Sequence, residues 1–130
     1  MIWLNVTYGL PPSIVPPYWH RHDELVWELS ALHTHWLSCF HESASPSAPI
    51  AWMRAFADAG HRLRDWVSTC GTRLDRDRPT RQTVWPGENG VELGGEISIA
   101  DRKQDFEEVV RAVVFRRRAA EAMANQALLG

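Results

Sequence analysis

The residues of this chain that could do chemistry are its six histidines and two cysteines. Zinc in proteins takes about four nitrogen or sulfur ligands in a tetrahedral arrangement, so the spacing of these side chains decides whether a site can form. His35 and Cys39 are four residues apart, and a helix presents side chains at that spacing on one face. Cys39 also continues an apolar stripe, however, where a free cysteine behaves as a small hydrophobe.

A better zinc candidate depends on how two helices pair. The sequence predicts amphipathic helices over 22–41 and 48–70, and their short connection favours an antiparallel arrangement. That arrangement brings Cys70 near His20 and His22, so these three residues are the best metal candidates. Histidines outside metal sites cap helices, form hydrogen bonds or face water. We expect the same here, with no cofactor bound.

Catalysis has weaker support in the sequence. His61 and Asp65 are four residues apart and could pair on a helix. No nucleophile motif, glycine-rich phosphate loop or pair of carboxylates accompanies them. We therefore expect a protein that is not an enzyme, with a metal-dependent hydrolase as the alternative if zinc is bound.

Aromatic and basic side chains indicate a binding surface instead. Tyr18, Trp19 and Arg21 come directly before the first helix. Trp27 lies on the side of that helix opposite its apolar stripe. Exposed aromatic residues and arginines are common anchors of protein interfaces. These four residues are therefore predicted to bind a partner, either another protein or a second copy of the chain.

A nucleic-acid-binding regulator is the rival hypothesis. The consecutive residues Arg116, Arg117 and Arg118 could contact phosphates. The formal net charge is −2, and acidic residues are interspersed with basic ones, so no chain-wide positive field attracts nucleic acid. Protein binding is therefore the first hypothesis and nucleic-acid binding, with or without zinc, the second.

Composition also indicates the compartment. Two cysteines are too few for a secreted disulfide scaffold and suit a reducing cytoplasm. The first ten residues lack the charged start and the small-residue cleavage site of a signal peptide. No segment reaches the roughly 20 apolar residues that span a membrane. We expect a cytoplasmic protein that does not contact the membrane.

Three helices are the elements that must position these residues. The length of 130 residues fits one domain with a single core. Apolar residues at intervals of three and four predict helices over 22–41, 48–70 and 99–128, which bury their stripes in a three-helix bundle. The three stripes consist of Leu25, Leu29, Leu32, Trp36 and Phe40; of Trp52, Phe56, Ala59, Leu63, Trp66 and Cys70; and of Phe106, Val109, Val110, Val113 and Val114.

The remaining segments, 1–21 and 71–97, have no helical pattern. Four prolines predict that 1–21 is an extended strap over the bundle, and the alternation in residues 2–8 predicts a short strand at its start. Within the charged loop 71–97, residues 83–85 and 91–93 could form a hairpin around a PGENG turn. The predicted fold is thus mainly α: a three-helix bundle with an extended Pro-rich N-terminal strap and a small β-hairpin.

Two tryptophan-containing segments read PPYWHRHDELVWELSALHTHWL and, after a gap rich in serine and proline, IAWMRAFADAGHRLRDWVSTCG. Together they cover about half of the chain, and they resemble a family of short actinobacterial proteins of unknown function that occur on plasmids, integrative elements and phages. The positions that carry the resemblance are Trp19, His22, Leu25 to Trp36, Trp52, Cys70, Gly71 and Arg73.

The resemblance has consequences for zinc and for function. Members of the family carry a histidine where Thr72 stands here, which weakens a zinc site at this end of the helix. No activity comes with the resemblance. It implies an accessory protein of a mobile element or phage, one that binds a host-encoded or element-encoded protein and could inhibit a host defence system.

Overall fold

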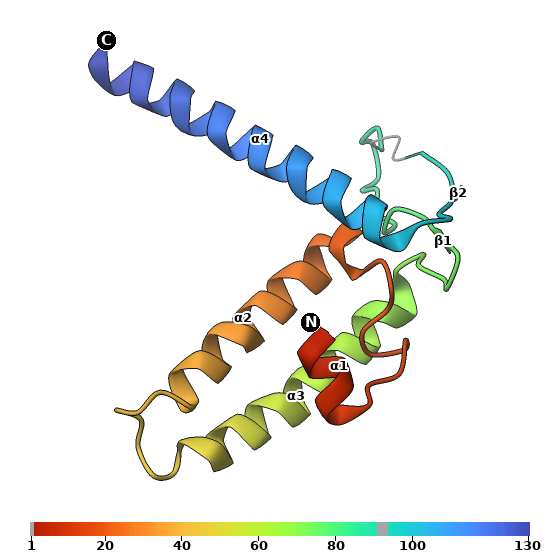
Figure 1. The fold of residues 1–130 in the computed structure, drawn as a ribbon. Helices are drawn as coiled ribbons and strands as arrows, with labels where there is room; N and C mark the ends of the chain where they lie inside the picture. The colour runs from red at the N-terminus through yellow and green to blue at the C-terminus, as the bar shows by residue number, and fades with distance from the viewer. Residues whose placement is uncertain (1, 91–93) are drawn as a thin grey trace.

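A computed structural model describes residues 2–90 and 94–130 of the chain and confirms a mainly helical fold with one small antiparallel sheet (Figure 1). The helices are α1 (Ile2–Tyr8), the short 3-10 helix η1 (Trp19–Arg21), α2 (Asp23–Cys39), α3 (Ala48–Thr69) and α4 (Arg102–Leu129). The strands are β1 (Arg76–Asp77) and β2 (Ile97–Ser98).

The core lies between α2 and α3, which run side by side in opposite directions (Figure 1). Leu25 and Leu29 on α2 are completely buried, and Trp52 and Leu63 on α3 are nearly so. The antiparallel pairing and both predicted stripes are therefore confirmed over most of their length. Phe40 and Trp66 are exceptions: Phe40, the C-cap residue of α2, is about half exposed, and Trp66 on α3 is 44% exposed.

Local signals fix the starts of the three long helices, which lie within three residues of the predicted starts. Asp23 and Glu24 occupy the first turn of α2, where the helix dipole favours negative charge. Pro49 lies in the first turn of α3, where a missing N–H costs nothing. Asp101 caps α4, and its carboxylate accepts the backbone N–H of Gln104 at 3.0 Å.

The N-terminal segment covers the core, but its start is not a strand. Ile14 and Val15 are buried against the α2–α3 pair, as expected for a strap. Residues 2–8 form α1, so the predicted strand is wrong. As a helix, the segment buries Leu4 and places Tyr8 one turn later, where its ring stacks on Phe56 with 4.3 Å between centroids. A strand would hold these residues too far apart for both contacts.

The small antiparallel sheet is confirmed, but its strands are not those predicted. Arg76 pairs with Ser98 and Asp77 with Ile97. The structure has no strand at 83–85, and the other predicted strand, 91–93, lies outside the described residues. The pairing forms at 76–77 because hydrogen bonds hold the residues beside it. The Ile99 N–H donates to the Asp75 carbonyl, and the hydroxyl of the buried Tyr18 donates to the Leu74 carbonyl.

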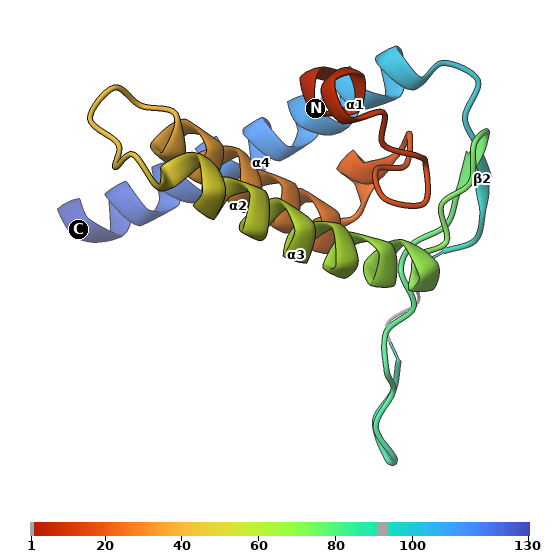
Figure 2. The ribbon, with the colours of Figure 1, turned by 90° about the horizontal axis from the view of Figure 1, so that it is seen from below.

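Helix α4 departs from the predicted bundle. Its close backbone contacts in the described part of the chain are with η1, at its own first turns. Beyond these turns it diverges from α2, and its C-terminal half extends away from the rest of the molecule (Figure 1). Seen from below, α4 passes behind α2 (Figure 2). The predicted burial of its apolar face is therefore wrong in part: Val110 and Val114 are 41% and 40% exposed. Every residue from Val114 to Gly130 is exposed.

No helix in the described ranges combines the length and the apolar character that crossing a membrane requires.

Candidate protein-binding groove

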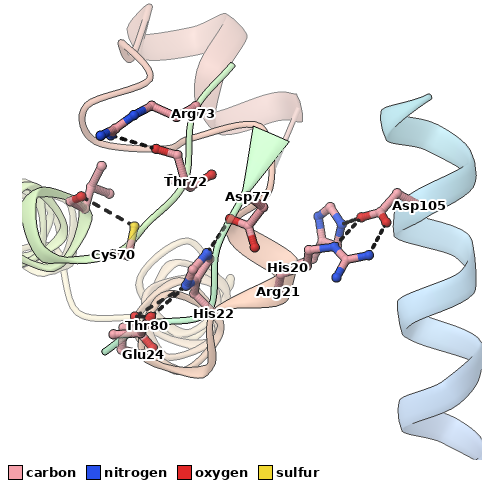
Figure 3. Close-up of polar contacts among 11 residues, drawn as sticks. His20, Arg21, His22, Glu24, Cys70, Thr72, Arg73, Asp77, Thr80 and Asp105 are labelled. Carbon is pink, nitrogen blue, oxygen red and sulfur yellow. Dashed lines mark hydrogen bonds and ion pairs between the residues drawn. The ribbon is translucent and has the colours of Figure 1, made fainter. Parts of the chain in front are cut away.

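A buried carboxylate, Asp105, fixes α4 to η1. Its Oδ2 atom lies 2.7 Å from His20 Nε2 and 2.9 Å from Arg21 Nε, and Arg21 Nη2 contacts the other oxygen (Figure 3). The Arg21 guanidinium lowers the pKa of Asp105, and the bond from His20 adds to this effect, although burial acts in the opposite direction. Asp105 is therefore ionised and holds the two elements together with charge-assisted hydrogen bonds.

His20 takes part in this contact as a neutral imidazole. Burial lowers the pKa of His20 more than the bond to Asp105 raises it. The Nδ1 atom is buried without a hydrogen-bond partner, so a proton there would be an unsatisfied donor. The single proton consequently lies on Nε2, which donates to Asp105.

His22 forms a second buried polar cluster two residues further on. Its Nε2 lies 2.6 Å from Asp77 Oδ1, its Nδ1 lies 2.7 Å from Thr80 Oγ1, and the Thr80 hydroxyl donates to Glu24 at 2.5 Å (Figure 3). A hydroxyl, an imidazole and a carboxylate in this order occur in nucleophilic enzymes. Here the single proton of the Thr80 hydroxyl is donated to Glu24, so it is not shared with the imidazole as nucleophile activation requires. The cluster instead ties the segment after α3 to the start of α2.

The three metal candidates have separate partners. The antiparallel helices do bring Cys70 to the end of the bundle that holds His22, as predicted (Figure 3). His20, however, faces Asp105, while His22 bonds to Asp77 and Thr80. Burial raises the pKa of the Cys70 thiol, which keeps it protonated and a poor metal ligand. Within residues 2–90 and 94–130, no three His, Cys, Asp or Glu side chains are arranged to hold one metal ion.

An apolar groove of about 560 Å³ lies between α2 and α4, with η1 at its closed end. The α2 wall consists of Asp23, Val26, Trp27 and Ser30, which share one face of the helix. The α4 wall is the face that the sequence predicted to be buried, and we call it the valine face. It consists of Phe106, Val109, Val110, Val113, Val114 and Arg117.

Two of the predicted partner-binding residues lie in this groove. Trp27 is 73% exposed, which confirms that it is on the outer side of α2. Trp19 is half buried, and its ring lies 5.9 Å from that of Phe106. The exposed Trp27 thus comes from α2, whereas Trp19, which contacts Phe106 at the closed end of the groove, comes from η1.

The other two predicted binding residues have structural contacts. Tyr18 was expected on the surface, but it is only 3% exposed, and its hydroxyl donates to the Leu74 carbonyl at 3.0 Å. Arg21 is occupied by its ion pair with Asp105. The predicted Tyr18–Trp19 surface pair is therefore wrong in its first member.

The arginine triplet is exposed on the extending part of α4. Arg117 lies at the far end of the groove, while Arg116 and Arg118 lie to either side of it on the helix. They remain candidates for contact with a charged partner.

Sequence reasoning missed the site as a whole, because it treated the valine face as core. A signal was present, since charged residues surround this face closely and arginines interrupt it at 116–118. No protein-family model, curated protein or solved structure matches the chain. The resemblance to the actinobacterial family thus stays a prediction, and function must be inferred from the groove itself.

Proposed function

We propose that this chain is a non-enzymatic protein-binding module whose binding surface is the groove between α2 and α4. One observation carries the proposal: Trp27 lies exposed beside a valine face that the described chain covers only in part, with Val110 and Val114 about 40% exposed. Contiguous apolar surface of this kind is uncommon on monomeric proteins, and where it occurs it usually marks an interaction site. Covering it would remove apolar area from water at about 25 cal/mol per Å².

The two walls of the groove are held in place before any partner arrives. Behind Trp27, the inner face of α2 is fixed by the buried residues Leu25 and Leu29. The α4 wall is fixed at its start by the bonds from His20 and Arg21 to Asp105. A preformed site loses less conformational entropy on binding, so more of the contact energy becomes affinity.

The shape of the groove supports a helical partner. Its two walls are helix faces, and such walls receive an amphipathic helix that presents apolar residues at intervals of three and four. The resemblance of the sequence adds that this partner could belong to a host of a mobile element or phage. The groove supports protein binding independently of that biological setting.

The proposal is tested by photo-cross-linking in cells. A benzophenone amino acid replaces Trp27 in the groove in one variant and Met53 on the outer face of α3 in the other, because both side chains are largely exposed. We expect covalent adducts from position 27 that are absent from position 53, with mass spectrometry identifying the captured protein. Equal labelling at both positions, or none at either, would contradict the proposal.

Trp27→Ala separates binding from folding. Because Trp27 is mostly exposed, we expect the free energy of unfolding to change by less than about 0.5 kcal/mol. We expect partner binding to weaken by at least about 2 kcal/mol, as is typical of a tryptophan hot spot. Urea unfolding and binding to the cross-linked partner provide the two measurements. An unfolded variant would show that Trp27 is a structural residue.

The exposed arginine triplet supports nucleic-acid binding as a second candidate function. Salt distinguishes the two candidates. A complex held by phosphate contacts weakens steeply between low and high salt concentrations, whereas an interface anchored by tryptophan and valine changes little.

A further inference from the structure

We infer that the partner in the groove is a second copy of this chain, bound with its α4 antiparallel to the first. This inference deepens the proposed function and rests on it, because the valine face is the surface to be covered. A second copy provides an amphipathic helix of the required kind, since α4 is 28 residues long and its second half is fully exposed.

Four charged residues lie beside the valine face. Their signs are ordered so that, in an antiparallel pair of α4 helices, facing positions carry opposite charges. Lys103, Glu107, Arg118 and Glu121 fall within a sector of about 60° on one flank of this face, given 3.6 residues per turn. All four are exposed, and none has a salt bridge within the described residues. From the N-terminus, the charges on this flank alternate in sign: the first and third residues are positive, and the second and fourth are negative.

An antiparallel two-fold arrangement pairs these charges with opposite signs. In such an arrangement each flank meets the same flank of the second copy, and residues equally distant from the crossing point face each other. With the crossing point at Ala112, Lys103 faces Glu121 of the second copy. Glu107 faces Arg118 of the second copy, because the midpoint between positions 107 and 118 lies half a residue from Ala112. Two-fold symmetry repeats both contacts and gives four ion pairs.

Side-chain size supports the same arrangement. The first half of the α4 face carries Phe106 and the valines, whereas the second half continues with Ala120 and Ala124. Antiparallel packing about Ala112 places Phe106 of each copy between Arg117 and Ala120 of the other, because these two residues share its face and lie on either side of position 118. The small side chain of Ala120 leaves room for the Phe106 ring.

A parallel arrangement would bring like charges together. Each flank would then meet the opposite flank of the second copy, on which Arg116 is exposed. Arg118 would approach Arg116 of the second copy, and symmetry would repeat this contact. Repulsion at both copies of this contact disfavours the parallel dimer, so the charge pattern selects one orientation as well as favouring association.

Charge exchange at one of the pairs tests the inference. We expect the purified chain to sediment as a dimer, at twice its mass of 14.8 kDa. Glu107→Arg and Arg118→Glu should each raise the dissociation constant about tenfold, because two attractive pairs per dimer become repulsive. The double variant should return to within about threefold of the unchanged chain, since the exchanged charges again attract each other. Arg54→Glu, on the exposed side of α3, is the matched control and should leave dimerisation unaltered.

Circular dichroism of each variant must show the same helix content, so that loss of dimer is not loss of fold. A purified chain that stays monomeric at about 100 µM would overturn the inference, because a dimer that covers the groove must have a dissociation constant below this concentration. A double variant that dimerises no better than either single variant would overturn the proposed pairing.

Cysteine cross-linking tests the orientation directly. Positions 107 and 118 are about 16 Å apart along one helix, at 1.5 Å per residue. An antiparallel dimer should therefore form a disulfide when Glu107→Cys and Arg118→Cys chains are mixed, but not within either sample alone, because a disulfide needs Cβ atoms about 4 Å apart. The native Cys39 and Cys70 are buried and do not compete. Cross-linking within the Glu107→Cys sample alone, or no cross-linking in the mixture of a chain that dimerises, would contradict the antiparallel pairing.

Failure of this inference differs from failure of the proposed function. If the purified chain is monomeric but position 27 cross-links to a different protein, the groove binds a partner that is not a second copy. If the chain dimerises with the expected charge dependence but position 27 gives no adduct, the α4 contact stands without the groove function.

Discussion

Asp105 is the residue on which the position of α4 most depends. It is buried, and its carboxylate accepts hydrogen bonds from both His20 and Arg21. These bonds join residues more than 80 positions apart in the sequence. No comparably buried polar contact exists elsewhere on α4 among the described residues. The Asp105 side chain therefore sets the angle at which α4 packs on η1, and with it the width of the groove between α2 and α4.

Asp105→Asn tests this role. The amide cannot carry the negative charge, so Arg21 loses its ion pair, and we expect a loss of about 1–3 kcal/mol in the free energy of unfolding. The estimate is kept low because the Arg21 side chain is partly exposed and water screens the pair. Urea unfolding measures the loss. Asp58→Asn, an exposed aspartate of α3, is the control, and equal midpoints for the two variants would show that Asp105 does not fix α4.

At the scale of elements, α2 and α3 carry the stability of the fold. Their contact depends on small sets of fully buried side chains, with Leu29 completely enclosed near the middle of α2. Removing such a side chain costs both the lost burial and the cavity that remains. Trp36 was predicted to belong equally to this core, but it is only half buried and contributes less.

We therefore expect Leu29→Ala to lower the free energy of unfolding by about 2–5 kcal/mol. Leu37→Ala removes the same atoms from an exposed position of the same helix, so it should cost less than about 0.5 kcal/mol. Thermal and urea unfolding of the two variants provide the comparison. Similar losses in both would mean that helix propensity, rather than packing, stabilises α2.

Elements with a strong local pattern were predictable from the sequence, and those set by distant contacts were not. The stripe of Leu25 and Leu29 repeats at helical spacing, so the periodicity alone defines α2. Residues 2–8 alternate in a way that also suits a strand, and only the contacts of Leu4 and Tyr8 with the core make them a helix. Tertiary packing overrides a weak pattern in so short a segment.

The candidate site shows the same division. Trp27 was placed correctly, because its side of α2 follows from spacing alone. The partners Asp77 and Asp105 were not foreseen, because nothing near them in the sequence indicates that they meet His22 and His20. The charged loop 71–97 also contributes two buried groups, Asp77 and Thr72, which its composition does not indicate. Only the folded chain shows which carboxylates are enclosed.

At the scale of the whole molecule, the buried contact between His20 and Asp105 makes stability depend on pH. The pKa of His20 is lowered in the folded state, so between this value and about 6.5 the unfolded chain binds a proton that the folded chain does not. Stability therefore falls as the pH drops below about 6.5. The pKa of Asp105 is also lowered, and its contribution is present above about pH 4 and lost as the pH falls through the folded value.

We expect the urea midpoint to decrease steadily between pH 7.5 and pH 5, and to decrease further at more acidic pH as Asp105 gains a proton. His20→Gln keeps a donor for Asp105 but removes the titrating group, so it should flatten the first part of this decrease. The other five histidines are present in both proteins and cancel in the comparison. An unchanged slope in His20→Gln would assign the pH dependence to a different histidine.

The way in which α4 is attached also has a consequence for the order of folding. The contacts between α2 and α3 join residues close in the sequence, whereas the contacts of Tyr18 and His20 with Ile99 and Asp105 close loops of more than 80 residues. Chain segments close short loops faster than long ones, because less chain entropy is lost. We therefore expect the helical hairpin to form before α4 docks. A nascent chain emerging from the ribosome would then present the outer face of α2, with Trp27 on it, before the second wall of the groove exists.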